Sequence, residues 1–275
     1  MQSTHKEACE KAARSLMCET MKKKANPGEI GAAHRSLPRL YVDATLRAGA
    51  TAECTSSQAN YLGNVLRLGV ADKLLVFNGR DGEWLAEITS MKRGASILTA
   101  REQIRPQTDG PDIHYLFAPL KKARLDYMVQ KATEMGVAAL RPVMTRRTNA
   151  ERVNIERMRA NAVEAAEQCG VLRLPEVFEP EKLGEALRGW DEARVLIFAD
   201  EAAPIASPLD ALGAVPRGPL ALLIGPEGGF DPAEREMLLR LPFVHAVSLG
   251  PRVMRADTAA VAALALMNAV LGDWG

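Results

Sequence analysis

The sequence contains few cysteines and no long apolar run. Its four cysteines are scattered along 275 residues as Cys9, Cys18, Cys54 and Cys169. They form no C-x-x-C pair and no Cys/His cluster, which argues against a zinc site and a disulfide framework and favours a reducing cytosol. No apolar stretch reaches the ~20 residues that a membrane-spanning helix needs. We therefore expect a cytoplasmic protein that binds no metal and enters no membrane.

The glycine-rich segments lack both common phosphate-binding fingerprints. No Gly-Lys-Ser/Thr follows the glycines of residues 225–229, and their spacing differs from G-x-G-x-x-G. A ligand held there would be bound mainly through backbone groups. An unrelated α/β nucleotide-binding enzyme is disfavoured for the same reason.

A strong net charge is also absent, since the whole chain carries only +1. The distribution of charge is more informative, because residues 121–159 hold ten Lys/Arg and four Asp/Glu. This local excess predicts a patch that faces phosphates. A solvated helical face is the alternative interpretation.

Residues 1–37 have the composition of an extension rather than of a fold. Glu7, Glu10 and Glu19 argue against a transit peptide, and the apolar h-region of a signal peptide is missing. We expect a disordered or loosely helical segment. Met17 and Met21 leave a later natural start open.

Residues 38–108 have an all-β pattern. The turn chemistry of residues 78–82, Asn-Gly-Arg-Asp-Gly, is typical of a hairpin, and residues 57–68 have helical character. Short strands are expected at residues 40–42, 74–77, 84–88 and 97–99. Several short strands with turns predict a small β-barrel, in which Arg67 could contact RNA.

The pattern changes after a Pro/Gly-rich linker at residues 105–111. Strands are expected at residues 114–118, 139–143 and 195–199, and helices at 124–135 and 154–168. Such alternation predicts a parallel sheet covered by helices, and thus an α/β domain over residues 109–275.

Two further strands of this domain, residues 220–224 and 244–249, each stop at a Gly-Pro pair before a helical signal. The first helix has Asp231 as N-cap, Pro232 in its first turn and Glu234 three residues after the cap. Ligands of open α/β sheets bind outside the carboxyl ends of the strands. The two loops therefore predict one site with two walls; a tight turn without a ligand is the alternative.

Four segments together carry a resemblance to a known family. They are Q-K-A-T-E-M-G-V (130–137), E-A-A-E-Q-C-G (164–170), I-G-P-E-G-G-F (224–230) and L-G-P-R-V-M-R-A-D-T-A (249–259). In this order they resemble the 16S ribosomal RNA uridine-N3 methyltransferases, the RsmE family. The resemblance spans about residues 38–275 and includes P-R-L-Y-V (38–42) and V-L-R-L (65–68).

The resemblance implies a SPOUT-type methyltransferase domain with a deep trefoil knot, preceded by a PUA-like barrel. It implies S-adenosylmethionine as cofactor, bound in the knot. It also implies a homodimer with the site near the subunit interface, and ribosomal RNA or the small ribosomal subunit as partner.

The family's cofactor residues carry over to both glycine-proline loops and to the start of the last helix. They are Ile224, Gly225, Pro226, Glu227, Gly228, Gly229, Leu249, Gly250, Arg252, Val253, Met254, Arg255 and Thr258. Leu249, Val253 and Met254 could form an apolar slot for adenine. Core packing is the alternative for Leu249 and Val253.

Uracil N3 carries a proton, so methylation there benefits from a base or from a cation that stabilises the imide anion. Arg255 is the candidate for anion stabilisation, and Glu227 and Asp257 are unranked candidates for the proton acceptor. Asp257 or Thr258 could instead cap the last helix. RNA contacts are expected from Lys121, Arg124, Lys131, Arg146, Arg147, Glu164, Gln168 and Arg173.

The chain departs from the family at three places. Ala256-Asp257 stands where Thr-Glu is usual, Arg146 where glutamate is common, and Val171 where arginine is frequent. These departures concern substrate contacts more than the fold or the cofactor. Two other readings stay open: a SPOUT methyltransferase for another ribosomal or transfer RNA site, and a non-catalytic RNA-binding factor for ribosome assembly. The barrel and the E-A-A-E-Q segment favour a 16S uridine-N3 methyltransferase over these two.

Overall fold

The computed structural model describes residue 34, residues 36–149 and residues 152–274. The predicted extension therefore lies almost entirely outside the described residues. The chain divides into two compact units. Of the described residues, the first contains 34, 36–38, 44–76 and 81–106, and the second contains the chain from residue 107 together with residues 39–43 and 77–80.

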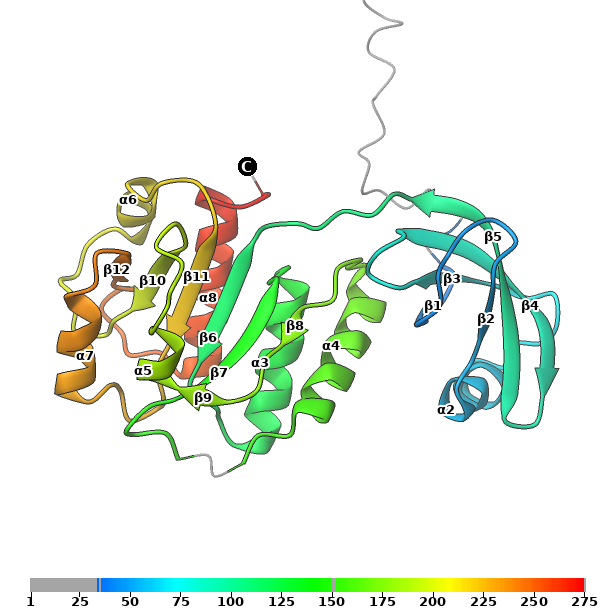
Figure 1. Ribbon diagram of the computed structural model, residues 1–275, viewed down its shortest axis with the longest axis horizontal. Coiled ribbons are helices and arrows are strands. Elements are labelled where there is room, and N and C mark those ends of the chain that lie inside the picture. Colours follow the sequence, from blue (N-terminus) through cyan, green and yellow to red (C-terminus); the bar gives the residue numbers. More distant parts are fainter. Residues whose placement is uncertain (1–33, 35, 150–151, 275) are drawn as a thin grey trace, which may run out of the picture. The chain divides into compact units, whose positions relative to one another are not determined.

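A sheet of five strands, in which β4 pairs antiparallel with β5 and β5 with β2, confirms the all-β prediction for the first third of the chain (Figure 1). Its strand order is β1 (Arg39–Tyr41), β3 (Lys73–Phe77), β4 (Glu83–Lys92), β5 (Ala95–Arg105) and β2 (Thr51–Glu53). The predicted hairpin turn lies between β3 and β4, where the Asn78 side chain accepts a hydrogen bond from the backbone N–H of Arg80 at 2.9 Å. The predicted helical segment is α2 (Ser56–Asn60), followed by a π-helical turn, η1 (Tyr61–Val65).

Two strands of this sheet differ from the prediction. β2 was not expected, and β5 continues through Arg105 into the expected linker. Both differences follow from tertiary pairing, because β5 has a long partner on one side, β4, and β2 on the other. The end of β5 is fixed by an ion pair inside the sheet, in which Arg105 donates to the fully buried Glu83 at 2.8 Å and 3.0 Å.

The second sheet confirms the parallel prediction, because every strand pairing that the structure describes in it is parallel. Its order is β12 (Val244–Val247), β10 (Val195–Ala199), β11 (Leu220–Ile224), β6 (Ile113–Phe117), β7 (Ala139–Met144) and β8 (Glu176–Val177), and β9 (Glu181–Lys182) also pairs with β7. All of these strands therefore end at one edge of the sheet.

Helices cover both faces of this sheet (Figure 1). One face packs against α3 (Lys122–Glu134), α4 (Ile155–Cys169), α6 (Pro208–Gly213) and α8 (Ala256–Val270). The other packs against α5 (Leu183–Ala186) and α7 (Pro232–Leu239). Successive side chains of a strand point to opposite faces, so Tyr115 and Leu222 join the first core whereas Leu116 and Leu223 join the second. With both faces buried, the central strands β10 and β11 are apolar throughout.

The two strands that end in Gly-Pro are not neighbours, because β10 lies between β11 and β12. β12 also stops at Val247, two residues before the predicted end. Closeness in sequence does not fix the order of parallel strands, since each crossover can place the next strand on either side. The residues at the carboxyl end of β10 therefore lie between the two predicted loops and form a third wall of the expected site.

Of the two helix starts next to these loops, one agrees with the prediction and the other differs from it. α7 begins as expected, with Asp231 as N-cap, Pro232 in the first turn and a reciprocal capping box with Glu234. α8 differs, because Arg255 occupies its N-cap without a side-chain cap bond. The expectation that Asp257 or Thr258 caps this helix is therefore wrong. Asp257 lies in the first turn and accepts a hydrogen bond from the backbone N–H of Thr258 at 2.9 Å.

Candidate functional site

A cavity of about 540 Å³ lies at the carboxyl edge of the parallel sheet. Its volume is within the range of small-molecule sites, roughly 300–1,000 Å³. Three walls form it: residues 199–202 after β10, residues 224–230 except Gly228 after β11, and residues 249–254 after β12. Part of α7 and the start of α8 complete the lining. The topology thus brings segments 50 residues apart in the sequence to one place.

Most residues of the predicted cofactor set line this cavity. They are Ile224, Gly225, Pro226, Glu227, Gly229, Leu249, Gly250, Arg252, Val253 and Met254. Gly228, Arg255 and Thr258 are adjacent in sequence but lie outside the lining. Leu249 is half-buried and also packs against the core, whereas the Val253 side chain is 84% exposed. Core packing therefore does not explain Val253.

Sequence reasoning missed the wall formed by residues 199–202. A signal was present, because the strand at residues 195–199 was predicted and ends at the same edge as the others. Here Asp200 is buried and forms an ion pair with Arg235 of α7 at 2.8 Å. The hydrogen bond to Asp200 raises the pKa of Arg235. This pair ties the end of β10 to the helix that follows the glycine loop.

The glycine loop after β11 is closely packed from within. A Cβ atom on Gly225 would come within 2.9 Å of one ring carbon of Phe230 and still closer to another. That ring cannot move freely, because it packs edge-on against Phe198 with the ring centroids 5.0 Å apart. Gly229 has a φ of +67°, a left-handed conformation that glycine adopts at little cost. The loop therefore depends on glycine for space at Gly225 and for backbone geometry at Gly229.

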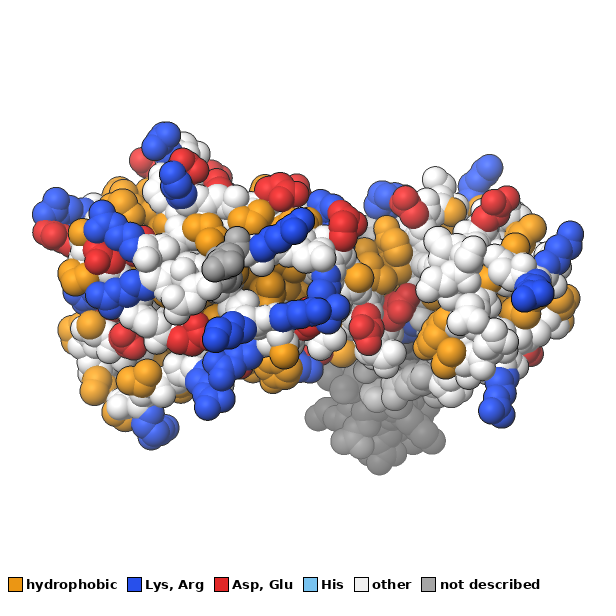
Figure 2. Space-filling model, turned by 90° about the horizontal axis from the view of Figure 1, so that it is seen from below, with side chains coloured by type: hydrophobic (Ala, Val, Ile, Leu, Met, Phe, Trp, Pro, Cys, Tyr) orange, Lys and Arg blue, Asp and Glu red, His pale blue; other side chains and the backbone are white. Residues whose placement is uncertain are grey.

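Three of the predicted RNA-contacting arginines hold this loop from its outer side. Arg147 donates to the carbonyl of Gly228 at 2.9 Å, Arg124 pairs with Glu227 at 3.3 Å, and Arg146 pairs with Asp231 at 2.9 Å. Figure 2 looks onto this edge of the sheet and shows Lys and Arg side chains gathered on it. Exposed pairs of this kind stabilise a fold by only about 0–1 kcal/mol each. Their guanidinium groups are thus partly available to an anionic ligand.

The other predicted RNA residues do not line the cavity. Lys131 forms an ion pair with Glu134 that raises the pKa of the lysine, and Arg173 donates to the carbonyl of Asp109. Lys121 is exposed at the N-cap of α3, and Glu164 and Gln168 are exposed on α4. Arg67 is exposed in the first unit, with a φ of +58°.

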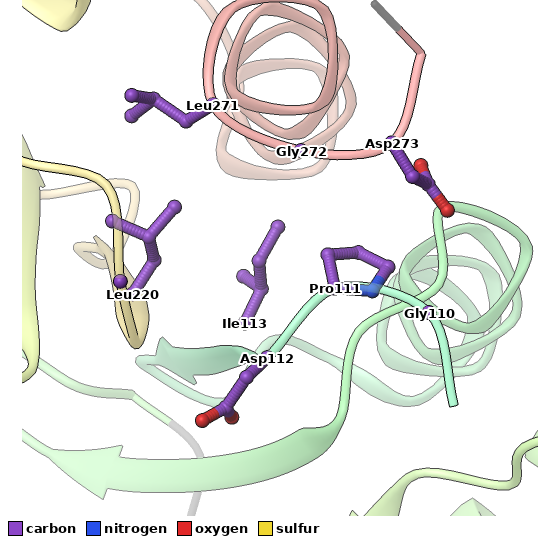
Figure 3. Close-up of a pocket in the computed structure, with 9 residues that line it drawn as sticks. Gly110, Pro111, Asp112, Ile113, Leu220, Leu271, Gly272 and Asp273 are labelled. Carbon is purple, nitrogen blue, oxygen red and sulfur yellow. The ribbon is translucent and has the colours of Figure 1, made fainter. Parts of the chain in front are cut away.

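A second cavity, of about 270 Å³, lies at the opposite edge of the sheet (Figure 3). It is formed by the amino ends of β6 and β11 and by the residues after α8. Figure 3 shows Ile113, Leu220 and Leu271 around the space, with the Asp112 carboxylate turned away from it. Arg194 donates to that carboxylate at 3.0 Å and 2.9 Å and lowers its pKa. This cavity thus has a mixed lining of apolar and polar groups, which includes Asp273, and the charge of Asp112 is paired.

In the described part of the chain, no group of three or more His, Cys, Asp or Glu side chains could hold a metal ion. No helix within it is long and apolar enough to cross a membrane.

Comparison with known proteins identifies relatives of both units. Residues 108–268 match the model of an RNA methyltransferase domain, and residues 55–99 match that of an RNA methyltransferase PUA domain. A Rickettsia conorii protein named Ribosomal RNA small subunit methyltransferase E is 30% identical over 229 residues, 82% of this chain and 93% of that protein. A protein of the same name from Synechocystis is 31% identical over 228 residues, 81% of this chain and 74% of that protein.

Two solved structures are similar over most of the chain. One is Ribosomal RNA small subunit methyltransferase E from Neisseria gonorrhoeae, bound to S-adenosylmethionine, with a TM-score of 0.78 and 26% sequence identity. The superposition covers 87% of this chain and 100% of the Neisseria chain. A Legionella pneumophila protein described as a methyltransferase, with S-adenosylmethionine bound, has a TM-score of 0.77 and 29% identity and covers 86% of this chain and 99% of that one.

The packing of the glycine loop predicts unequal effects of two alanine substitutions. Gly225→Ala should lower the free energy of unfolding by about 1–3 kcal/mol, because the new methyl group would displace the Phe230 ring. Gly228→Ala is the matched control, since its Cβ would lie 3.8 Å from Arg147, and should change stability by less than about 0.5 kcal/mol. Urea unfolding of both variants measures the difference, and equal stabilities would contradict this account of the loop.

Proposed function

This chain belongs to the ribosomal RNA small subunit methyltransferase E family, and we propose that it methylates N3 of one uridine in 16S ribosomal RNA. It is an S-adenosylmethionine-dependent RNA methyltransferase with a SPOUT-type α/β domain and a PUA-like domain. Ribosomal RNA is its substrate. The N3 position and the roles of individual residues are the parts that we propose.

The observation that carries the proposal is the cavity with three walls at the carboxyl edge. Its lining fits S-adenosylmethionine, which has an adenine ring, a ribose and an amino-acid moiety but no phosphate. Ile224, Leu249 and Met254 offer apolar surface for the adenine, and the glycine loops offer backbone donors and acceptors for its edges. The close packing at Gly225 and Gly229 keeps these backbone groups in one arrangement.

Bound S-adenosylmethionine supplies a methyl group on a positively charged sulfur, which a nucleophile can attack in line. The protein has to hold the uridine in that line and to help N3 lose its proton. Arg255 supports the second task, because its side chain is exposed beside the cavity and has no described hydrogen bond or ion pair among the residues that the structure covers. We assign to it the stabilisation of the imide anion.

The geometry favours Glu227 over Asp257 as the proton acceptor. Glu227 lines the cavity, its side chain is 38% exposed, and Arg124 holds its carboxylate. Asp257 does not line the cavity, and its carboxylate already accepts a hydrogen bond at the start of α8. Asp257 therefore suits a structural role in the first turn of α8, where a negative charge is favourable.

The three arginines that bond to the glycine loop and to Asp231 are suited to phosphate contacts. Arg124, Arg146 and Arg147 lie on the outer side of the loop that lines the cavity. Such contacts would add affinity and orientation rather than sequence recognition. For Lys121, Lys131 and Arg173 we propose only weaker phosphate contacts of the same kind.

We further propose a homodimer and a trefoil-knotted cofactor domain, as in the family. The dimer is supported by apolar side chains at the rim of the cavity, since Ile205 is 71% exposed and Leu239 is 44% exposed, beside the exposed Val253. A second copy would remove these surfaces from water. A cytoplasmic location follows from the proposed substrate, because ribosomes are assembled there.

Methyl mapping tests the function as a whole. Small ribosomal subunits from cells that lack this protein should gain one methyl group, on N3 of a single 16S uridine, when incubated with the purified protein and S-adenosylmethionine. Mass spectrometry of nuclease fragments locates the methyl group. Transfer RNA from the same cells serves as the competing substrate, and methylation of it instead would refute the proposal.

The proposed role of Arg255 predicts a loss of turnover without a loss of cofactor. Arg255→Ala should lower kcat about 10²–10³-fold, because a charge that stabilises the transition state is removed. The dissociation constant of S-adenosylmethionine should stay within about threefold, as expected when only transition-state stabilisation is lost. Arg240→Ala, an exposed arginine of the same unit paired with Glu236, is the control. Near-normal turnover of the Arg255 variant would remove the assignment.

The proposed base predicts an ordered pair of effects. Glu227→Gln should lower kcat about 10²–10⁴-fold and flatten the rise of the rate with pH, because the amide cannot accept the proton. Asp257→Asn should lower kcat by a smaller factor and leave the rise of the rate with pH unchanged. Single-turnover rates between pH 6 and 9 separate the two roles. A larger loss and a flattened profile in the Asp257 variant would reverse the ranking.

A further inference from the structure

The cavity contains a carboxylate that the proposed mechanism does not use. Glu201 follows β10 by two residues, is exposed and lines the cavity. Because β10 lies between β11 and β12, Glu201 leaves the sheet between the glycine loop and the loop of residues 249–254. Its side chain thus occupies the middle wall of the site.

Glu201 is the carboxylate of this lining whose charge stays unpaired within the described residues. The other three are engaged: Asp200 with Arg235, Glu227 with Arg124, and Glu236 with Arg240. A carboxylate only accepts hydrogen bonds, so an unpaired one in a ligand cavity is suited to donor groups of the ligand. Residues 199–206 read A-D-E-A-A-P-I-A and contain no arginine or lysine. Of the two arginines in the lining, Arg235 pairs with Asp200 and Arg252 has no described ion pair.

The Glu201 carboxylate lies against the glycine loop. A Cβ atom on Gly229 would lie 2.7 Å from Oε1 of Glu201, closer than two such atoms can approach. The missing side chain of Gly229 therefore leaves the space that the carboxylate occupies. Glu201 thus lies against the backbone of a loop that lines the same cavity.

We propose that the Glu201 carboxylate accepts hydrogen bonds from the ribose hydroxyl groups of the cofactor. This inference rests on the proposed function, because it assumes that S-adenosylmethionine occupies the cavity. The vicinal hydroxyls supply two donors to one carboxylate, and hydrogen bonds to a charged acceptor are stronger than those between neutral groups. An acidic residue near the glycine loop has the same role in dinucleotide-binding sheets, which is an analogy of geometry and not of sequence.

Calorimetric titration with S-adenosylhomocysteine tests the contact without any turnover. Glu201→Gln should weaken binding about 10-fold and Glu201→Ala up to about 100-fold, the range for hydrogen bonds to a charged group. Glu192→Gln is the matched control, because it removes an exposed carboxylate of the same unit outside this lining, and its affinity should stay within about twofold. The 2′-deoxy and 3′-deoxy analogues should bind the wild-type protein more weakly and should lose less on the Glu201 substitution.

Other results of this titration would overturn either the ribose contact or the proposed function. If Glu201→Gln weakened S-adenosylmethionine but not S-adenosylhomocysteine, the carboxylate would face the sulfonium charge and the ribose assignment would fall. Unchanged affinity in a folded Glu201 variant, checked by its thermal unfolding, would also overturn it. If the wild-type protein bound neither compound, the proposed function itself would fail.

Discussion

The carboxyl edge of the parallel sheet is the constraint on which the site depends. Every described strand of that sheet runs in the same direction, so the turns after β10, β11 and β12 all emerge on one side. Burial of both faces fixes the strands in place, with Leu222 in one core and Leu223 in the other. Segments that are unrelated in sequence can then form a single cavity, because the sheet supplies their relative positions.

The glycine loop illustrates how that cavity is kept in shape by opposing contacts. Phe230 packs beneath Gly225, Glu201 rests against Gly229, and Arg147 holds the carbonyl of Gly228 from outside. Backbone atoms would otherwise be free to turn away from a ligand, at a cost in entropy on binding. The outer contacts are exposed and individually weak, whereas the inner ones are steric. The inner packing therefore determines the shape of the loop, and the arginines can exchange partners without destroying it.

The sequence predicted the parts of the site that depend on local chemistry. Asp231, Pro232 and Glu234 specify a helix start within four residues, and the structure has it there. The order of the strands could not be predicted in this way, because placing β10 between β11 and β12 depends on which faces the crossover helices bury. For the same reason the middle wall with Glu201 was missed. Pairing of Arg124 with Glu227, 103 residues apart, likewise becomes visible only after folding.

Arg255 shows a local choice that stability alone would not favour. It is the N-cap of α8, a position where Ser, Thr, Asp or Asn would satisfy a free backbone N–H and where a positive charge opposes the helix dipole. Asp257 in the first turn offsets part of that cost, because its carboxylate accepts from the backbone N–H of Thr258. Local rules are broken in this way mainly where a side chain serves a function. An arginine that caps nothing, beside the cavity, contributes little to the helix, and this position supports the role in the reaction that we propose for it.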